Sequence, residues 1–163
     1  MNETSQHHAK SQPPGSTRRR FLFGGGVAVV AAGAFAARWY NISAETGATA
    51  LNVADAYAAA QGGEIVLVDV RRPDDWARTG VGQGAVPIDM RRPDFVAAVS
   101  EALSGDRSRP VALICARGVR SRRMSEALAD AGFTQVLDVP EGMLGSGAGP
   151  GWLRSGLPVA RVD

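Results

Sequence analysis

The chain has 163 residues, of which 45% are hydrophobic, and it carries 18 basic and 16 acidic residues. This length suits one domain with a single core, and the composition excludes both a disordered chain and two full-sized domains. Four basic residues and one acidic residue lie in residues 1–36, so the remaining 14 basic and 15 acidic residues give no excess positive charge that would indicate nucleic-acid binding.

The N-terminal segment has the layout of an export signal. Thr17-Arg18-Arg19-Arg20-Phe21-Leu22 is followed by an uncharged, Gly-rich apolar run from Phe23 to Ala37. This run is too short to span a membrane comfortably, and the order resembles the twin-arginine signature (Ser/Thr)-Arg-Arg-x-Phe-Leu. Ala34 and Ala36 offer a cleavage site before Ala37.

We therefore expect a twin-arginine signal peptide over residues 1–36, a linker over residues 37–48 and a folded domain over residues 49–163. The folded domain would then work in the periplasm or otherwise outside the cytoplasm. Two alternatives stay open: an uncleaved segment that anchors the protein to the membrane, and a disordered basic tail that precedes an ordinary helix.

From Leu51 onward, short apolar runs alternate with segments of helical periodicity. This alternation predicts an α/β fold with a central, mostly parallel sheet covered by helices on both faces. The expected strands are Ile65–Val70, Val111–Ile114 and Gln135–Val139, and the expected helices are Val53–Ala60, Asp74–Arg78, Phe95–Leu103 and Ser121–Ala131. Asp74, Asp94 and Ser121 are interpreted as helix starts, and Gly145–Gly151 as a flexible surface loop.

Cys115, the only cysteine, follows an expected strand and precedes a helix. In open α/β sheets, ligands bind at this edge of the sheet. Free backbone N–H groups and the helix dipole favour a thiolate there, and Gly118 allows a backbone with positive φ. The candidate site is Cys115 as nucleophile with the loop residues Ala116, Arg117, Gly118, Val119, Arg120 and Ser121. The alternative is an inert, buried cysteine.

Both histidines, His7 and His8, lie in the expected signal peptide. The folded part would then have no imidazole to serve as a base or as a metal ligand. This excludes a Cys–His hydrolase and a zinc site, and no cofactor or metal is expected.

The segment from Cys115 to Ser121 resembles the Cys-x-x-Gly-x-Arg-Ser active-site loop of single-domain rhodaneses. Other segments resemble landmarks of the same family in the right order, over about Leu51 to Val159: Val68-Asp69-Val70-Arg71, Gly84-Ala85-Val86-Pro87-Ile88, Glu141-Gly142-Met143, Trp152 and Gly156-Leu157-Pro158-Val159. Two segments depart from the family. Many relatives have Gly-His-Ile-Pro-Gly-Ala at residues 80–85, and Met143 replaces the second Gly of the closing pair.

The resemblance implies a sulfurtransferase in which Cys115 takes sulfane sulfur from a small anionic donor such as thiosulfate. The resulting persulfide would pass sulfur to a thiol or cyanide-like acceptor, or to a protein acceptor. Arg71 would bind the donor in this family's geometry, or else pair with Asp74 or Asp75. Asp69 is expected to support the loop or neighbouring backbone, because no basic partner is evident. Nucleic acid is not an expected partner, and a membrane is one only through an uncleaved signal.

Two other functions compete with this interpretation. Cysteine-dependent phosphatases and arsenate reductases also place a thiolate in an anion-binding loop, but their loop resembles Cys-x5-Arg. Here Arg120 arrives one residue early, and Ile114 stands where those enzymes usually have His. The other alternative is a non-enzymatic persulfide carrier or a redox-sensing binding module. The Gly145–Gly151 loop is a candidate surface for recognition of a partner.

Overall fold

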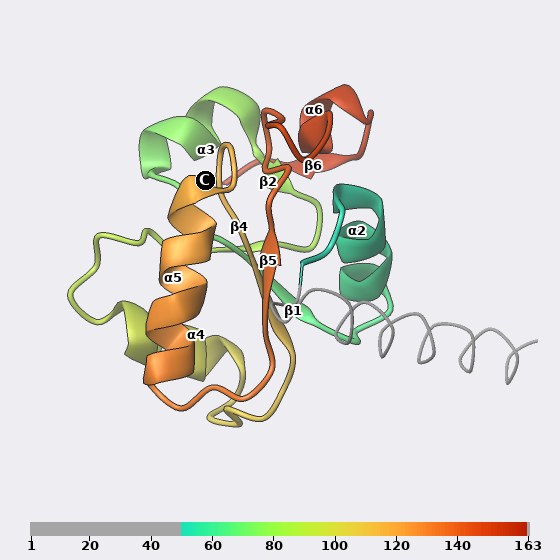
Figure 1. Cartoon of the computed structure of the whole chain (residues 1–163). Helices are drawn as coiled ribbons and strands as arrows, with labels where there is room; N and C mark the ends of the chain where they lie inside the picture. Colours follow the sequence, from blue (N-terminus) through green and yellow to red (C-terminus); the bar gives the residue numbers. More distant parts are fainter. Residues whose placement is uncertain (1–49, 163) are drawn as a thin grey trace, which may run out of the picture. The chain divides into compact units, whose positions relative to one another are not determined.

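Four parallel strands form the central sheet of the computed structural model, which describes residues 50–162 (Figure 1). The strands are β1 (Val66–Asp69), β3 (Val86–Pro87), β4 (Val111–Ile114) and β5 (Val136–Val139), and they lie in the order β3-β1-β4-β5. Every pairing among them is parallel, and β4 lies between β1 and β5. The expected signal peptide (residues 1–36) and linker (residues 37–48) lie outside the described residues.

Helices cover both faces of this sheet, as the alternating pattern predicts. Figure 1 shows α4 and α5 on one side and α2 on the other. The helices are α2 (Val53–Gln61), α3 (Pro73–Thr79), α4 (Phe95–Ala102), α5 (Val119–Asp130) and α6 (Gly151–Arg154). None of the helices in the described part of the chain is long and apolar enough to cross a membrane.

The three predicted strands are confirmed, and β4 is fully buried along its whole length. A continuous apolar run is typical of a strand that is covered on both faces. The sequence did not predict β3, α6 or the small antiparallel sheet of β2 (Val81–Gly82) and β6 (Val159–Ala160). These elements have only two to four residues each, which is too short to show a periodic pattern.

Two of the predicted helix starts are wrong. Helix α3 begins at Pro73, with Arg72 before it, so Asp74 is its second residue; proline is favoured at the first helical position because its missing N–H would have no partner there. Helix α5 begins at Val119 after Gly118, so Ser121 lies inside the first turn. Asp94 does precede α4, although its carboxylate pairs with Arg92 and does not cap the helix.

Glu141 joins the first and last described helices of the domain. Its carboxylate is buried and accepts hydrogen bonds from the Val53 N–H at 3.2 Å and from the Gly151 N–H at 3.0 Å, the first amides of α2 and α6. Negative charge at a helix N-terminus is favourable, because it meets free donors and the positive end of the dipole. Next to this contact, Trp152 is fully buried and meets Tyr57 edge to face.

Candidate active site

Cys115 lies directly after β4, at the carboxyl end of the central sheet. Only 1% of the residue is exposed, and it packs in the core cluster with Leu113 and Leu128. The three residues that follow lead to the N-terminus of α5. The structure therefore confirms the expected place of the thiol between a buried strand and a helix start. It also shows that the thiol is buried where the loop begins.

The loop after Cys115 presents a series of free backbone donors. None of the N–H groups of residues 116–121 donates to a protein acceptor within the described part of the chain. Gly118 has a φ of 84°, which reverses the chain so that α5 begins at Val119. Free N–H groups at a helix N-terminus are suited to bind an anion.

Ser121 has a supporting place in this loop. Its side chain is fully buried, and its hydroxyl donates to the Gly118 carbonyl at 3.1 Å. This hydrogen bond stabilises the turn at Gly118 from its buried side. Ser121 therefore stabilises the loop from inside the helix, although it does not start the helix as the sequence suggested.

The segment from Pro140 to Leu144 lies against the loop. The N–H of Met143 donates to the Cys115 carbonyl at 2.8 Å, and the N–H of Leu144 donates to the Ala116 carbonyl at 2.9 Å. A Cβ on Gly142 would lie 2.6 Å from the Ala116 carbonyl carbon, so this position requires glycine. Met143 is fully buried. Its departure from the family's second glycine therefore adds a core side chain beside the site.

Arg120 belongs to an ion-pair network between α3 and α5. Its guanidinium lies 3.4 Å from Asp75, whose other oxygen pairs with Arg78 at 2.5 Å. Burial alone would raise the pKa of Asp75, but the Arg72 N–H and the Arg120 guanidinium outweigh it and hold that pKa below its usual value of 3.8. The carboxylate therefore stays ionised and keeps Arg120 beside the loop.

Asp69 and Arg71 form a buried ion pair. The expectation that Asp69 supports neighbouring backbone agrees with its hydrogen bond from the Arg71 N–H, but the expected absence of a basic partner for Asp69 was wrong. Two oxygens of Asp69 accept hydrogen bonds from the Arg71 guanidinium at 2.7 to 3.0 Å, and one also accepts from the Arg71 N–H at 3.1 Å. The guanidinium also donates to Thr79 and to the Gly80 carbonyl. Arg71 is 1% exposed and pairs with Asp69, and not with Asp74 or Asp75. This buried position does not support the prediction that Arg71 binds the sulfur donor.

Arg117 and Val119 point away from the protein core. Arg117 is exposed, and no carboxylate of the described residues pairs with it. Val119 is 78% exposed although it is apolar. The thiol of Cys115 is therefore buried, and the backbone N–H groups after it are free to bind a ligand. Arg117 and Val119 are the exposed side chains of the loop.

The segment expected to be a flexible loop, Gly145–Gly151, is held by hydrogen bonds. Ser146 and Gly149 form an antiparallel bridge, and the Ser146 hydroxyl donates to the Pro140 carbonyl at 2.7 Å. Gly151 already belongs to α6. Because Pro140 also packs against Gly118, this turn lies beside the active-site loop.

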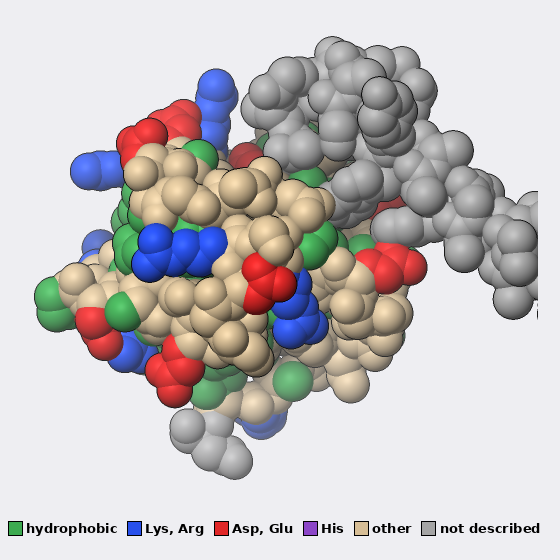
Figure 2. All heavy atoms as spheres, turned by 90° about the horizontal axis from the view of Figure 1, so that it is seen from below, with side chains coloured by type: hydrophobic (Ala, Val, Ile, Leu, Met, Phe, Trp, Pro, Cys, Tyr) green, Lys and Arg blue, Asp and Glu red, His purple; other side chains and the backbone are tan. Residues whose placement is uncertain are grey.

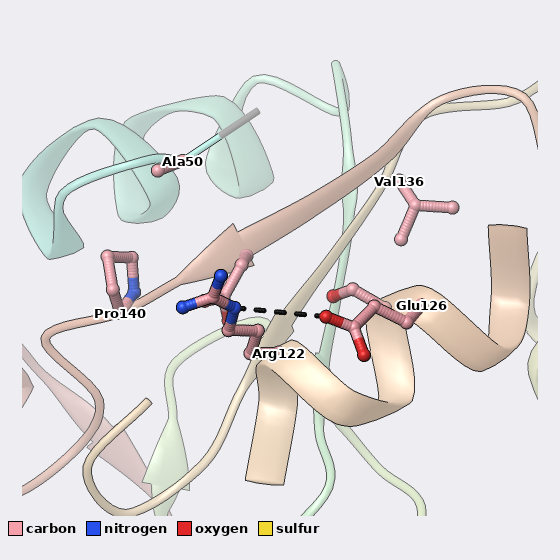
Figure 3. A pocket seen from close by; sticks show the side chains of 7 residues that line it. Ala50, Arg122, Glu126, Val136 and Pro140 are labelled. Carbon is pink, nitrogen blue, oxygen red and sulfur yellow. Dashed lines mark ion pairs between the residues drawn. The ribbon is translucent and has the colours of Figure 1, made fainter. Parts of the chain in front are cut away.

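A separate pocket of about 330 Å³ opens between α5 and β5 (Figure 3). Figure 3 shows Arg122 and Glu126 of α5 side by side at this pocket, where they form an ion pair at 3.8 Å. Asp138 also lines the pocket, and its Oδ1 is buried with no hydrogen-bond partner among the described residues. Burial raises the pKa of Asp138. Cys115 does not line this pocket.

Comparison with known proteins places this geometry in a family. Residues 52–146 match the family model of the rhodanese-like domain. A search of curated proteins gives no match.

Solved structures share the fold at low sequence identity. Thiosulfate sulfurtransferase from Pseudomonas aeruginosa is 23% identical, with a TM-score of 0.57 over 75% of this chain, which spans only 22% of that chain. The polysulfide-sulfur transferase homodimer from Wolinella succinogenes is 23% identical, with a TM-score of 0.55 over 86% of this chain and 93% of that one.

A third solved structure carries a different description. A protein of unknown function from Rhodopseudomonas palustris, described as a possible tyrosine phosphatase, is 22% identical, with a TM-score of 0.53 over 92% of this chain and 100% of that one. At such identities these similarities show the fold alone.

Proposed function

The chain belongs to the rhodanese-like family, and from this premise we propose that it is a sulfurtransferase that carries sulfane sulfur on Cys115. One observation carries the proposal. The thiol lies below a loop whose N–H groups, from residue 116 to residue 121, have no acceptor within the described part of the chain. Such N–H groups can stabilise both the anionic sulfur donor and the persulfide that forms from it.

The first step is loading of Cys115. Its thiolate attacks the outer sulfur of thiosulfate, the S–S bond of thiosulfate breaks, and the electron pair leaves with sulfite. The new bond joins Cys115 Sγ to the outer sulfur. The side chains of Arg117 and Arg120 lie on this loop and supply positive charge for the sulfonate oxygens and for the leaving sulfite.

The second step regenerates the thiolate. Cyanide or a thiolate attacks the outer sulfur of the persulfide, the bond to Sγ breaks, and its electron pair stays on Cys115. The products are thiocyanate or a new persulfide. Neither step needs a general base, which agrees with a folded domain that has no histidine in its sequence.

A persulfide carrier is the second candidate, and the 1% exposure of Cys115 favours it. A thiol this deeply buried takes part in a reaction only when a narrow group reaches it through the loop. A carrier would hold one sulfur and release it slowly to small acceptors.

The site is also proposed to work outside the cytoplasm. Residues 17–22 support this proposal, because they resemble a twin-arginine signature and precede an apolar run. A protein with one cysteine has no intramolecular disulfide partner in an oxidising compartment, so its thiol stays available for sulfur chemistry.

The deciding experiment compares three reactions of the purified protein. Steady formation of thiocyanate from thiosulfate and cyanide is expected, with negligible hydrolysis of an aryl phosphate. Mass spectrometry should detect one added sulfur on the wild type and none on Cys115→Ser. Persulfide formation without turnover would select the carrier, whereas faster phosphate hydrolysis than sulfur transfer would replace the proposal by the phosphatase.

A further inference from the structure

The outer surface of the active-site loop has properties that a small donor does not require. Val119 is the most exposed of the large apolar residues in the described part of the chain, at 78%, and Leu144 is 40% exposed. An anion of the size of thiosulfate gains nothing from an apolar side chain that faces water. Two such side chains beside one buried thiol are more typical of a protein contact surface.

Val119 and Leu144 are placed at the two ends of the loop. The Leu144 N–H donates to the carbonyl of Ala116, the residue next to the thiol. Val119 is the first residue of α5, at the other end of the loop. Val119 and Leu144 are therefore exposed apolar side chains next to the loop that follows Cys115.

Basic side chains surround this apolar pair. Arg117 is exposed between the thiol and Val119, and Arg123 is exposed one helical turn after Val119 on the same side of α5. Neither guanidinium pairs with a carboxylate among the residues that the structure describes. We call the set Arg117, Val119, Arg123 and Leu144 the rim.

The opposite end of the sheet has charges of both signs. Figure 2, seen from below Figure 1, shows basic and acidic side chains mixed on that end of the domain. The basic side chains visible on that face thus have acidic neighbours, whereas no ion pair joins Arg117 or Arg123 to a carboxylate of the described residues. Unpaired cations beside the thiol raise the local concentration of acidic partners.

We propose that the rim docks a protein sulfur acceptor that presents its thiol next to an apolar residue and within an acidic surface. This inference rests on the proposed function and names the class of acceptor. The acceptor thiolate attacks the outer sulfur of the Cys115 persulfide, the bond to Sγ breaks, and its electron pair stays on Cys115. The acceptor leaves as a protein persulfide, so the step needs no oxidant.

Two synthetic peptides test the proposal. Each has one cysteine next to a leucine, and they differ only in having glutamates or lysines at the flanking positions. Cys115 is loaded from thiosulfate or, chemically, from inorganic polysulfide, and transfer to the peptide is followed by mass spectrometry. The acidic peptide should accept sulfur about tenfold faster than the basic one at low salt. This difference in rate should shrink as the salt concentration approaches 1 M, because the Debye length is then about 3 Å and charges on the two surfaces are screened from each other.

Variants outside the loop locate the effect. Leu144→Ser and Arg123→Glu should each slow transfer to the acidic peptide several-fold and leave transfer to cyanide unchanged. Val86→Ser is the matched apolar control, because Val86 is 38% exposed on β3. Arg109→Glu is the charge control, because Arg109 precedes the amino end of β4, away from the loop.

The outcomes separate the two proposals. Equal rates for both peptides, with no effect of Leu144→Ser or Arg123→Glu, would overturn docking on the rim while sulfur transfer to cyanide stands. If Cys115 takes up sulfur from neither thiosulfate nor polysulfide, the proposed function itself fails, and this inference fails with it.

Discussion

Gly118 packs directly on the carbonyl group of Pro140. A Cβ on Gly118 would lie 3.0 Å from the carbonyl carbon of Pro140 and closer still to its oxygen, and the backbone of Gly118 has a φ of 84°. The reversal of the chain after Cys115 therefore depends on a glycine for two independent reasons, one conformational and one steric.

The first prediction follows from this contact. Gly118→Ala should lower the free energy of unfolding by more than the roughly 1–2 kcal/mol expected for an alanine in the left-handed conformation, because the loop must also move away from Pro140. Gly132→Ala is the matched control, since Gly132 has a φ of 88° but open space around a Cβ. Urea unfolding and thiocyanate formation measure both effects. Equal losses of stability in the two variants would show that the contact with Pro140 is unimportant.

The second prediction concerns the ion pair between Asp75 and Arg120. The pKa of Asp75 is lowered in the folded protein, so its contribution to stability is present above the unfolded value near 3.8 and is lost as the pH falls through the folded value. Asp75→Asn should lower stability by up to about 1 kcal/mol at pH 7, and the difference from wild type should shrink at pH 3. Thermal unfolding at pH 7, 5 and 3 measures this, with Asp74→Asn as control. A difference that does not depend on pH would contradict the prediction.

The third prediction has the opposite sign. Burial raises the pKa of Asp138, so the ionised form is penalised in the folded state, and stability falls as the pH rises from 3.8 through the folded value. Asp138→Asn should therefore be more stable than wild type at pH 7 and nearly equal to it near pH 3. The same unfolding series measures this variant. Lower stability of the variant at pH 7 would mean that the carboxylate has a favourable partner there.

The fourth prediction concerns export. Replacement of Arg18 and Arg19 by lysines should leave the precursor in the cytoplasm, because a twin-arginine receptor reads the guanidinium pair and not charge alone. Cell fractionation with immunodetection measures this, and Arg20→Lys is the control. Normal processing of the double variant would instead indicate a general secretory signal.

The sequence was sufficient for the parts of the fold that have strong patterns. Strand β4 is a continuous apolar run and helix α5 spans three turns, so both could be predicted with the loop between them. Strands β2, β3 and β6 have two residues each, and their pairing depends on distant segments that leave no local signal. The same holds for Glu141, because one of its partners, Val53, lies 88 residues away in the chain.

The candidate site was predicted less evenly. Cys115 and its loop lie where the sequence indicated, because one strand and one helix place them. The partner of Arg71 was missed although the spacing allowed it, because residues two apart in an extended segment face the same side and Asp69 is such a neighbour of Arg71. The guanidinium turns back at the end of β1 and reaches both oxygens of that carboxylate.

Glu141 sets the minimum length of an independently folding fragment. The family match ends at residue 146, but the second oxygen of Glu141 takes its donor from Gly151, and Trp152 fills the space beside Tyr57. A fragment that stops at residue 146 would leave a buried carboxylate oxygen without that donor and would open the cavity that Trp152 occupies. Glu141 and Trp152 therefore connect the two ends of the described domain, and these contacts extend beyond residue 146, where the family match ends.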